Sequence, residues 1–159
     1  MTDAFEVRPL GRVHGGRAEV ADDDWGDVRA DLVLDPDAVG PDATAGLEAF
    51  SHLEVVFLFD RVDPQHVTTG ARHPRGNTAW PRVGILAQRG KNRPNRLAIS
   101  RCRLVAVDGL RLTVEGLDAV DGTPVLDVKP WMEEFAPQGP VRQPAWSREL
   151  MAGYWRADA

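Results

Sequence analysis

The sequence predicts a mainly β protein: a single antiparallel β-barrel with short flanking helices, not a Rossmann fold. Three observations support this. About seven short segments have β-type patterns, no strand–helix–strand alternation occurs, and an Asp-Gly turn joins the two clearest strands. Closing such a sheet removes exposed strand edges. We expect one domain over residues 1–159, with its core at about 5–130 and a C-terminal tail and helix at 131–159.

The N-terminal third of the chain predicts three strands and one helix. Residues 5–14 are expected to form the first strand. Residues 28–34 alternate apolar and polar side chains, which is typical of a strand with one face in water. Residues 42–53 predict a short helix with Asp42 as its N-cap. Residues 53–59 are almost purely apolar, so a central strand covered on both faces is expected there.

The middle of the chain is rich in loops and then becomes regular. Residues 61–80 have no clear period, and a loop of this length is usually functional or disordered. A short strand at 83–87 and a basic loop at 88–96 follow. Residues 97–107 and 110–117 predict a hairpin around Asp108-Gly109, and residues 123–129 the last strand.

The C-terminal tail combines a proline-rich stretch with an amphipathic segment. Residues 130–144 are irregular in pattern, whereas residues 146–155 predict a helix with an apolar side. That side contains Trp146, Leu150, Met151, Tyr154 and Trp155. We expect it to pack on its own barrel, with a dimer contact or a lid as the alternatives.

Composition narrows the functional classes. A net charge of -5 and a pI near 5.3 argue against a general nucleic-acid coat or a polybasic membrane binder. The single cysteine, Cys102, excludes an internal disulfide and a thiolate zinc cluster. The chain has neither a membrane-length apolar run nor an N-terminal signal core, so we expect a cytoplasmic protein.

The average charge conceals a strong asymmetry. The stretch from Pro64 to Val107 contains no Asp or Glu but nine basic residues: Arg72, Arg75, Arg82, Arg89, Lys91, Arg93, Arg96, Arg101 and Arg103. The rest of the chain therefore carries -14, the difference between -5 and +9. Such segregation creates a local potential that steers anions. The alternative is a solvated loop onto which acidic segments fold back.

Several familiar chemistries are absent from the sequence. The four histidines (His14, His52, His66 and His73) lack the spacing of a metal site, so no metal is expected. No Gly-x-Ser-x-Gly or phosphate-binding glycine motif occurs, and Cys102 is expected to face the core. Two features remain. Arg89 and Arg93 suit a carboxylate or phosphate, and Asp118 and Asp121 either cap turns or receive hydroxyls or an amine.

Three motifs resemble the TsaA-like (TrmO) family. They are Gly46-Leu-Glu-Ala-Phe-Ser-His-Leu53, Arg93-Pro-Asn95 and Leu117-Asp-Ala-Val-Asp-Gly-Thr-Pro-Val-Leu-Asp-Val-Lys-Pro130. The resemblance runs from about Pro9 to Pro130, and its last motif is long and specific. It implies an S-adenosylmethionine-dependent methyltransferase with a β-barrel fold that works as a homodimer. The best-known members methylate N6 of threonylcarbamoyladenosine next to the anticodon of tRNA.

The resemblance also implies where S-adenosylmethionine binds. The implied cofactor-binding residues lie in five places: Asp23, Asp24 and Trp25; Asp60 and Arg61; Arg89; Ile99; and Leu117, Asp118, Ala119, Val120 and Asp121. Arg93, Asn95 and Lys129 are the expected substrate-binding residues, and Asp60 is the candidate general base. In this reading Arg89 pairs with the methionine carboxylate of the cofactor.

Two alternatives to a tRNA methyltransferase stay open. One keeps the cofactor but takes a small-molecule acceptor, since the basic loop suits a small anion. The other is a non-catalytic S-adenosylmethionine-binding module on the same barrel. A tRNA substrate predicts local docking through the basic segment, with an affinity that falls steeply as the salt concentration rises.

Overall fold

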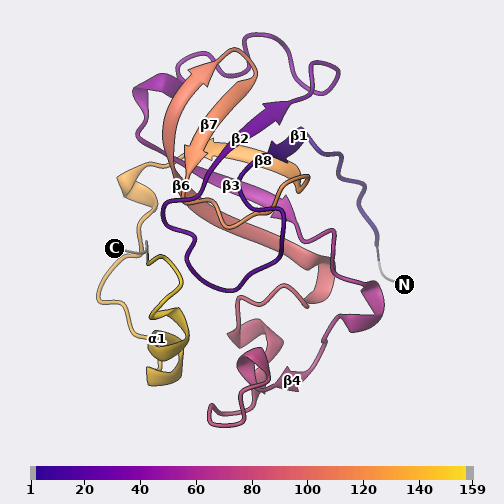
Figure 1. Ribbon diagram of the computed structural model, residues 1–159, viewed down its shortest axis with the longest axis vertical. Helices are drawn as coiled ribbons and strands as arrows, with labels where there is room; N and C mark the ends of the chain where they lie inside the picture. Colours follow the sequence, from indigo (N-terminus) through magenta and orange to yellow (C-terminus); the bar gives the residue numbers. More distant parts are fainter. Residues whose placement is uncertain (1–2, 157–159) are drawn as a thin grey trace.

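The computed structural model describes residues 3–156, and within them six antiparallel strands form a closed barrel in the order β1-β2-β7-β6-β3-β8 (Figure 1). The barrel strands are β1 (Gly11–His14), β2 (Arg29–Leu34), β3 (His52–Leu58), β6 (Leu97–Asp108), β7 (Arg111–Glu115) and β8 (Pro124–Pro130). The predicted β-barrel is confirmed. Residues 1–2 and 157–159, the outer limits of the expected domain, lie outside the described residues.

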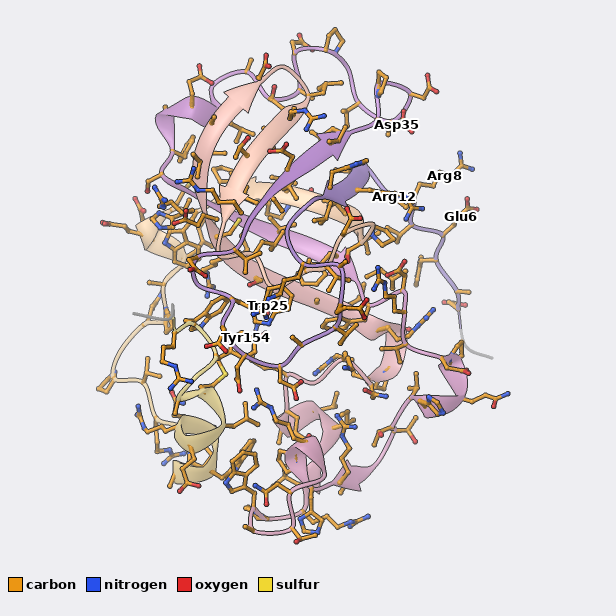
Figure 2. All side chains as sticks on the ribbon, viewed as in Figure 1. Glu6, Arg8, Arg12, Trp25, Asp35 and Tyr154 are labelled. Carbon is orange, nitrogen blue, oxygen red and sulfur yellow. The ribbon has the colours of Figure 1, made fainter. Side chains whose placement is uncertain are left out.

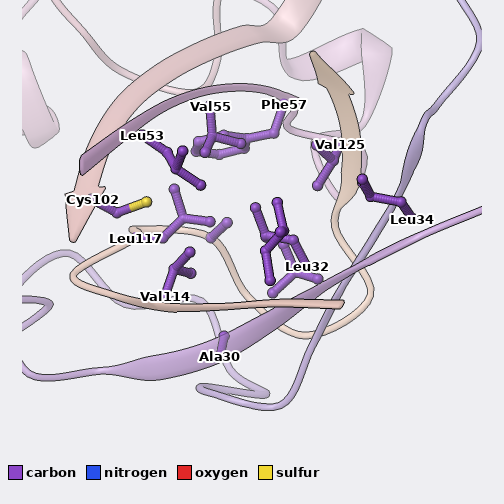
Figure 3. Close-up of a cluster of buried hydrophobic side chains, with 13 residues drawn as sticks. Ala30, Leu32, Leu34, Leu53, Val55, Phe57, Cys102, Val114, Leu117 and Val125 are labelled. Atoms are coloured by element: carbon purple, nitrogen blue, oxygen red, sulfur yellow. The ribbon is translucent and has the colours of Figure 1, made fainter. Parts of the chain in front are cut away.

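Alternating side chains fill the interior of the barrel. The inward residues of β3 are Leu53, Val55 and Phe57, all at most 1% exposed, and Leu32 of β2 is fully buried (Figure 3). Each such burial stabilises the fold by about 1.5–3 kcal/mol. Cys102 is 3% exposed among them, as expected. The outward residues of β3 are partly exposed, so the prediction of a strand covered on both faces was wrong.

The hairpin of β6 and β7 forms as the sequence predicts. Gly109, in the turn, has a φ of 57°, a left-handed conformation that glycine adopts without strain. The pairing register shifts between Leu104 and Ala106. Thr44 donates a 2.7 Å hydrogen bond to the Gly109 carbonyl, which ties the turn to the loop after β2.

The connection from β7 to β8 closes one end of the barrel. Two strands separate β7 from β8 on either way around the barrel, so residues 116–123 must cross its end. Leu117 and Ala119 of this crossing point into the hydrophobic core. We call residues 116–123 the crossing segment. It places Asp118 and Asp121 at the closed end.

Two N-terminal predictions were wrong in their limits. The first strand covers only residues 11–14 of the expected 5–14, because Pro9 has no N–H to donate to a ladder. Residues 42–53 do not form a helix: a 3-10 turn spans only Leu47–Ala49. Gly46 adopts a left-handed conformation before it, and from His52 onward the chain belongs to β3.

Residues 59–96 form a separate lobe below the barrel (Figure 1). The lobe contains 3-10 turns and a small two-stranded sheet of β4 (Ala71–Arg72) and β5 (Val83–Gly84). The strand expected at 83–87 ends after Gly84 because residues Ile85–Ala87 turn into a 3-10 helix. The expected loop at 88–96 is confirmed, apart from a 3-10 turn at Pro94–Arg96.

The C-terminal helix is shorter than expected and contacts its own chain. Helix α1 covers Ala145–Met151 instead of 146–155. Trp80 of the lobe donates a 2.8 Å hydrogen bond from Nε1 to Glu149 of this helix. The residues after it turn toward the barrel. Within residues 3–156, the helices are too short or too polar to cross a membrane.

Candidate functional site

The loop between β1 and β2 holds the first predicted group, Asp23, Asp24 and Trp25. Trp25 is only 3% exposed, and the Arg17 guanidinium lies 4.7 Å from the centre of its ring. Arg17 also donates a 2.6 Å hydrogen bond to the Asp23 carbonyl. The tryptophan is therefore a buried anchor that fixes the loop. Asp23 and Asp24 remain partly exposed beside it.

Arg61 joins three chain segments that are far apart in sequence. Its guanidinium donates hydrogen bonds to the carbonyls of Ala18, at 2.6 Å, and Asp121, at 3.0 Å. Asp121 in turn accepts the Gly15 N–H on its carboxylate at 2.8 Å. The opening loop, the end of β3 and the crossing segment thus meet at one end of the barrel. The sequence predicted all three segments, and the structure brings them together.

The crossing segment divides its predicted residues between the core and the surface. Leu117, Ala119 and Val120 are at most 9% exposed, so their side chains serve the interior. Only the backbone N–H and C=O groups of these three residues remain available to bind a ligand. Asp118 is half-buried, and its Oδ1 is buried without a hydrogen-bond partner among the described residues. A carboxylate oxygen in that state is costly unless a ligand or water satisfies it.

Tyr154, from the segment after α1, also lies at this end (Figure 2). Its hydroxyl donates a hydrogen bond to Oδ2 of Asp118. Burial is the main cause that raises the pKa of the Tyr154 phenol well above its ordinary value, and the Asp118 charge adds to it. The positive charges of Arg89 and Arg75 act in the opposite direction. The phenol therefore remains a hydrogen-bond donor at neutral pH.

Arg89 and Ile99, two of the positions that the resemblance implies, contact each other. Arg89 donates a 2.9 Å hydrogen bond from Nη2 to the Ile99 carbonyl. Its guanidinium is exposed and close enough to Tyr154 for its charge to act on that phenol. Ile99 lies on the outer face of β6 and is 45% exposed. The charge of Arg89 thus acts on the phenol that bonds to Asp118.

The remaining predicted residues are spread more widely. Arg93 donates a 2.6 Å hydrogen bond to the Gln88 carbonyl, and Asn95 has a left-handed φ of 62° in the next turn. Asp60 is exposed just after β3. Lys129 lies beside Glu54 at the start of β3, whereas Arg61 follows its end. Lys129 also pairs with Asp127 at 2.8 Å, so the structure does not bring it together with the others.

Most of the basic segment lacks carboxylate partners. Of its nine basic residues, three form ion pairs within residues 3–156: Arg75 with Asp23, Arg101 with Glu54, and Arg103 with Glu115. Arg89, Arg93 and Arg96 donate only to backbone carbonyls. Acidic segments therefore fold back onto the basic segment at one lobe position, Arg75. The lobe keeps most of its positive charge.

A cavity of about 390 Å³ opens next to this barrel end. Its lining comprises Gly26, His52, Arg101, Cys102, Arg103, Glu115, Gly116 and Trp155. Burial, followed by the charge of Asp118, raises the pKa of Cys102 to about 12, so the thiol is not a nucleophile at neutral pH. Within the described residues, His, Cys, Asp and Glu form no group suited to a metal ion.

Tyr154 is the residue that sequence reasoning missed. The amphipathic pattern assigned it to the packing face of a helix that ends earlier than expected. Its chemistry was nevertheless visible, because it is the only tyrosine of the chain and follows a glycine. A phenol at the end of a helix, instead of inside it, is free to bond to another segment.

Comparison with known proteins identifies relatives of this domain. A family model described as the tRNA-methyltransferase O N-terminal domain matches residues 23–136. A tRNA (adenine(37)-N6)-methyltransferase of Escherichia coli (strain K12) is 42% identical over 96 residues, 57% of this chain and 40% of that protein. A "probable S-adenosyl-L-methionine-binding protein" of Archaeoglobus fulgidus is 32% identical over 111 residues, 61% of this chain and 29% of that protein.

A solved structure extends the similarity to nearly the whole chain. A crystal structure of TrmO from P. aeruginosa superposes with a TM-score of 0.73 and 28% identity. The match covers 92% of this chain and 63% of that one. The chain therefore spans only part of the length of these relatives.

Proposed function

Because this chain belongs to the family of tRNA-methyltransferase O N-terminal domains, we propose that it is an S-adenosylmethionine-dependent methyltransferase whose substrate is tRNA. The observation that carries the proposal is that an unsatisfied carboxylate oxygen and an unneutralised guanidinium belong to residues whose charges both act on Tyr154. Asp118 has an unpartnered carboxylate oxygen, and Arg89 an exposed guanidinium without a carboxylate partner among residues 3–156. An amino-acid group needs such a pair, a carboxylate for its ammonium and a guanidinium for its carboxylate.

The residues fit the cofactor in chemistry. Oδ1 of Asp118 suits the ammonium of its methionine part, and Arg89 suits the methionine carboxylate. Arg61 fixes the backbone of Asp121 and the opening loop, which are the groups left for the ribose and the adenine. S-adenosylmethionine, when bound, supplies a sulfonium-linked methyl group for in-line displacement. The protein contributes alignment, which is worth several kcal/mol of barrier by itself.

The proton that the acceptor nitrogen loses has one candidate base. Asp60 lies on the surface just after β3, next to Arg61, where an acceptor can approach it. The alternative is release of the proton to water after transfer, which requires no general base. Cys102 is excluded from this role because its thiol is buried and keeps its proton. Replacement of Asp60 by asparagine therefore decides whether a base is used.

The lobe provides the docking surface for tRNA in this proposal. Arg82 and Lys91 carry no ion pair within the described residues. Arg93 and Asn95 lie in the same lobe. The negatively charged phosphates of tRNA would pair with the basic side chains of this surface. We propose N6 of threonylcarbamoyladenosine next to the anticodon as the methylated atom, as the family resemblance implies.

A deletion strain tests the proposed function. Nucleosides from its tRNA are analysed by mass spectrometry for methylated N6-threonylcarbamoyladenosine. We expect the methylated nucleoside to disappear and to return with the plasmid-borne gene. Its persistence, together with transfer of label from the donor to a small molecule, would favour the small-molecule alternative. Binding of the donor without any transfer would favour the non-catalytic module.

We also propose that the chain acts as a homodimer. Leu86, Leu97 and Ile99 are 80%, 46% and 45% exposed, and exposed apolar side chains that gather in a patch favour association. Leu97 and Ile99 share the outer face of β6. Light scattering at several protein concentrations is expected to give twice the mass of one chain. Substituting aspartate for Ile99 should then yield monomers.

A further inference from the structure

The last residues of the described chain form a strap across the opening loop. Asp24 donates a 3.1 Å backbone hydrogen bond to the Gly153 carbonyl, and Trp25 one of 2.9 Å to the Tyr154 carbonyl. Gly26 lies so close to the strap that an added Cβ would stand 2.1 Å from the Trp155 carbonyl oxygen. We call residues 152–155 the C-terminal strap. Its position is fixed by backbone contacts, so it is a built part of this barrel end.

The strap places one functional group beside the crossing segment. The Tyr154 hydroxyl donates to Oδ2 of Asp118, which leaves Oδ1 of the same carboxylate as the unpartnered atom (Figure 2 shows Tyr154 next to Trp25). The Tyr154 ring also packs edge-on against Trp155, with centroids 4.8 Å apart. The contact with Trp155 limits the rotation of the Tyr154 side chain, and the hydrogen bond from Tyr154 limits the rotation of the Asp118 carboxylate. Neither Tyr154 nor Trp155 belongs to the hydrophobic core cluster of the barrel.

We propose that the C-terminal strap completes the cofactor site and that Tyr154 is a positioning residue, which holds the Asp118 carboxylate so that Oδ1 receives the cationic end of the methyl donor. This inference rests on the proposed function. It extends that function to the strap, whose Tyr154 lies 18 residues beyond position 136, where the family match ends. A carboxylate that already accepts one fixed hydrogen bond loses less rotational freedom when it binds a cation. The strap therefore raises affinity without contacting the donor through its own hydroxyl.

The charges around Tyr154 agree with this role. Asp118 provides a negative charge on one side, and Arg89 and Arg75 act on the phenol with positive charges. Arg75 is itself held by Asp23, at 3.0 Å. The phenol thus donates to a carboxylate and also feels the positive charge of two guanidinium groups, the two kinds of charge that an amino-acid moiety requires.

Isothermal titration with S-adenosylmethionine tests the proposal. The set comprises the wild type, Tyr154→Phe, Asp118→Asn and the double variant. Glu149→Gln serves as the matched control, because it weakens a contact of the same C-terminal segment without touching Asp118. We expect Tyr154→Phe to weaken binding by about tenfold, the loss of one hydrogen bond to a charged group. The control should stay within about twofold, as is usual for a surface contact.

The double variant distinguishes positioning from simple structural support. If Tyr154 acts through Asp118, adding Tyr154→Phe to Asp118→Asn changes the dissociation constant little further. Additive losses would overturn the proposal, as would unchanged binding by Tyr154→Phe. A wild-type protein that does not bind the donor would overturn the proposed function itself, and this inference with it.

The single tyrosine gives a second measurement on the unmodified protein. Tyrosine labelled with ¹³C at Cζ yields one resonance that belongs to Tyr154. We expect this resonance to move when S-adenosylmethionine saturates the wild type, and to start from a different position in Asp118→Asn. A resonance that ignores both changes would overturn the proposal even if Tyr154→Phe failed to fold.

Discussion

Most arginines of the barrel strands form ion pairs, whereas in the lobe only Arg75 does so within the described residues. On the outer face of the barrel, carboxylates of neighbouring strands pair with the arginines: Glu115 binds Arg29 and Arg103, Asp31 binds Arg111, and Glu54 binds Arg101. In the lobe of residues 59–96, Arg89, Arg93 and Arg96 donate to carbonyl groups instead. Carbonyl groups orient a guanidinium but do not neutralise its charge.

We interpret this difference as a division of roles between a barrel wall that stabilises the fold and a lobe that binds a ligand. Cross-strand ion pairs offset most of the charge of the barrel wall: four arginines face three carboxylates, because Glu115 binds two of them. The lobe keeps an oriented positive charge next to the closed barrel end, where it attracts anions. The negative net charge of the whole chain conceals this division. Four predictions test the contrast, from the largest expected effect to the smallest.

A core substitution in the barrel should have the largest effect. Phe57→Ala removes a 1% exposed ring and is expected to lower the free energy of unfolding by about 3–5 kcal/mol. The lobe substitution Arg82→Ala should change it by less than about 0.5 kcal/mol. Urea denaturation followed by tryptophan fluorescence measures both. Similar losses would show that the lobe carries stability as well.

Arg89→Ala should separate binding from stability. We expect the affinity for S-adenosylmethionine to fall by about tenfold or more, because a charge-assisted contact is lost. The paired barrel variant Arg111→Ala is the control and should bind as the wild type does. Titration calorimetry measures both. An unchanged isotherm for Arg89→Ala contradicts its assignment to the methionine carboxylate.

The salt dependence of tRNA binding should depend on the lobe. Arg82→Gln and Lys91→Gln are each expected to reduce the slope of log affinity against log salt by about 0.7–1, as for one lost phosphate contact. The paired Arg111→Gln should leave the slope unchanged. Filter binding at several salt concentrations gives these slopes. A flat dependence in the wild type would favour a small-molecule acceptor.

The ion pairs of the barrel should contribute least. The hydrogen bond from Thr113, followed by the contacts with Arg111, holds the pKa of Asp31 below its ordinary value. The stabilisation of the fold by the ionised Asp31 carboxylate is therefore present at neutral pH and is lost as the pH falls through the lowered pKa. We expect Asp31→Asn to cost about 1 kcal/mol or less at pH 7. The difference from the wild type should vanish in strong acid, as measured by urea denaturation.

Much of the barrel was predictable because its strands follow a two-residue period. The Asp108-Gly109 hairpin and the inward position of Cys102 follow from that period. The limits of the first strand and the absence of a helix at 42–53 do not follow from that period. They depend on hydrogen-bond partners in the sheet: Pro9 has no N–H to donate to a neighbouring strand, and the residues from His52 onward pair as part of β3. The lobe has no period because backbone carbonyls and 3-10 turns organise it.

The candidate site was predictable in its segments but not in its contacts. The family resemblance pointed to Arg61, Arg89 and the crossing segment; in the structure Arg61 bonds to Asp121 of that segment, and Arg89 bonds to Ile99 of β6. Pattern alone did not reveal that Leu117 serves the core, or that Lys129 lies beside Glu54. Tyr154 escaped because its bond to Asp118 spans 36 residues and depends on where α1 ends.

Methyl transfer by the purified chain tests the central claim most directly. The protein is incubated with methyl-labelled S-adenosylmethionine and with tRNA that carries unmethylated threonylcarbamoyladenosine, and the nucleosides are then separated by mass. We predict label on N6 of that nucleoside with the wild type, and strongly reduced label with Arg89→Ala. Unlabelled tRNA, from a protein that binds the donor, would contradict the account.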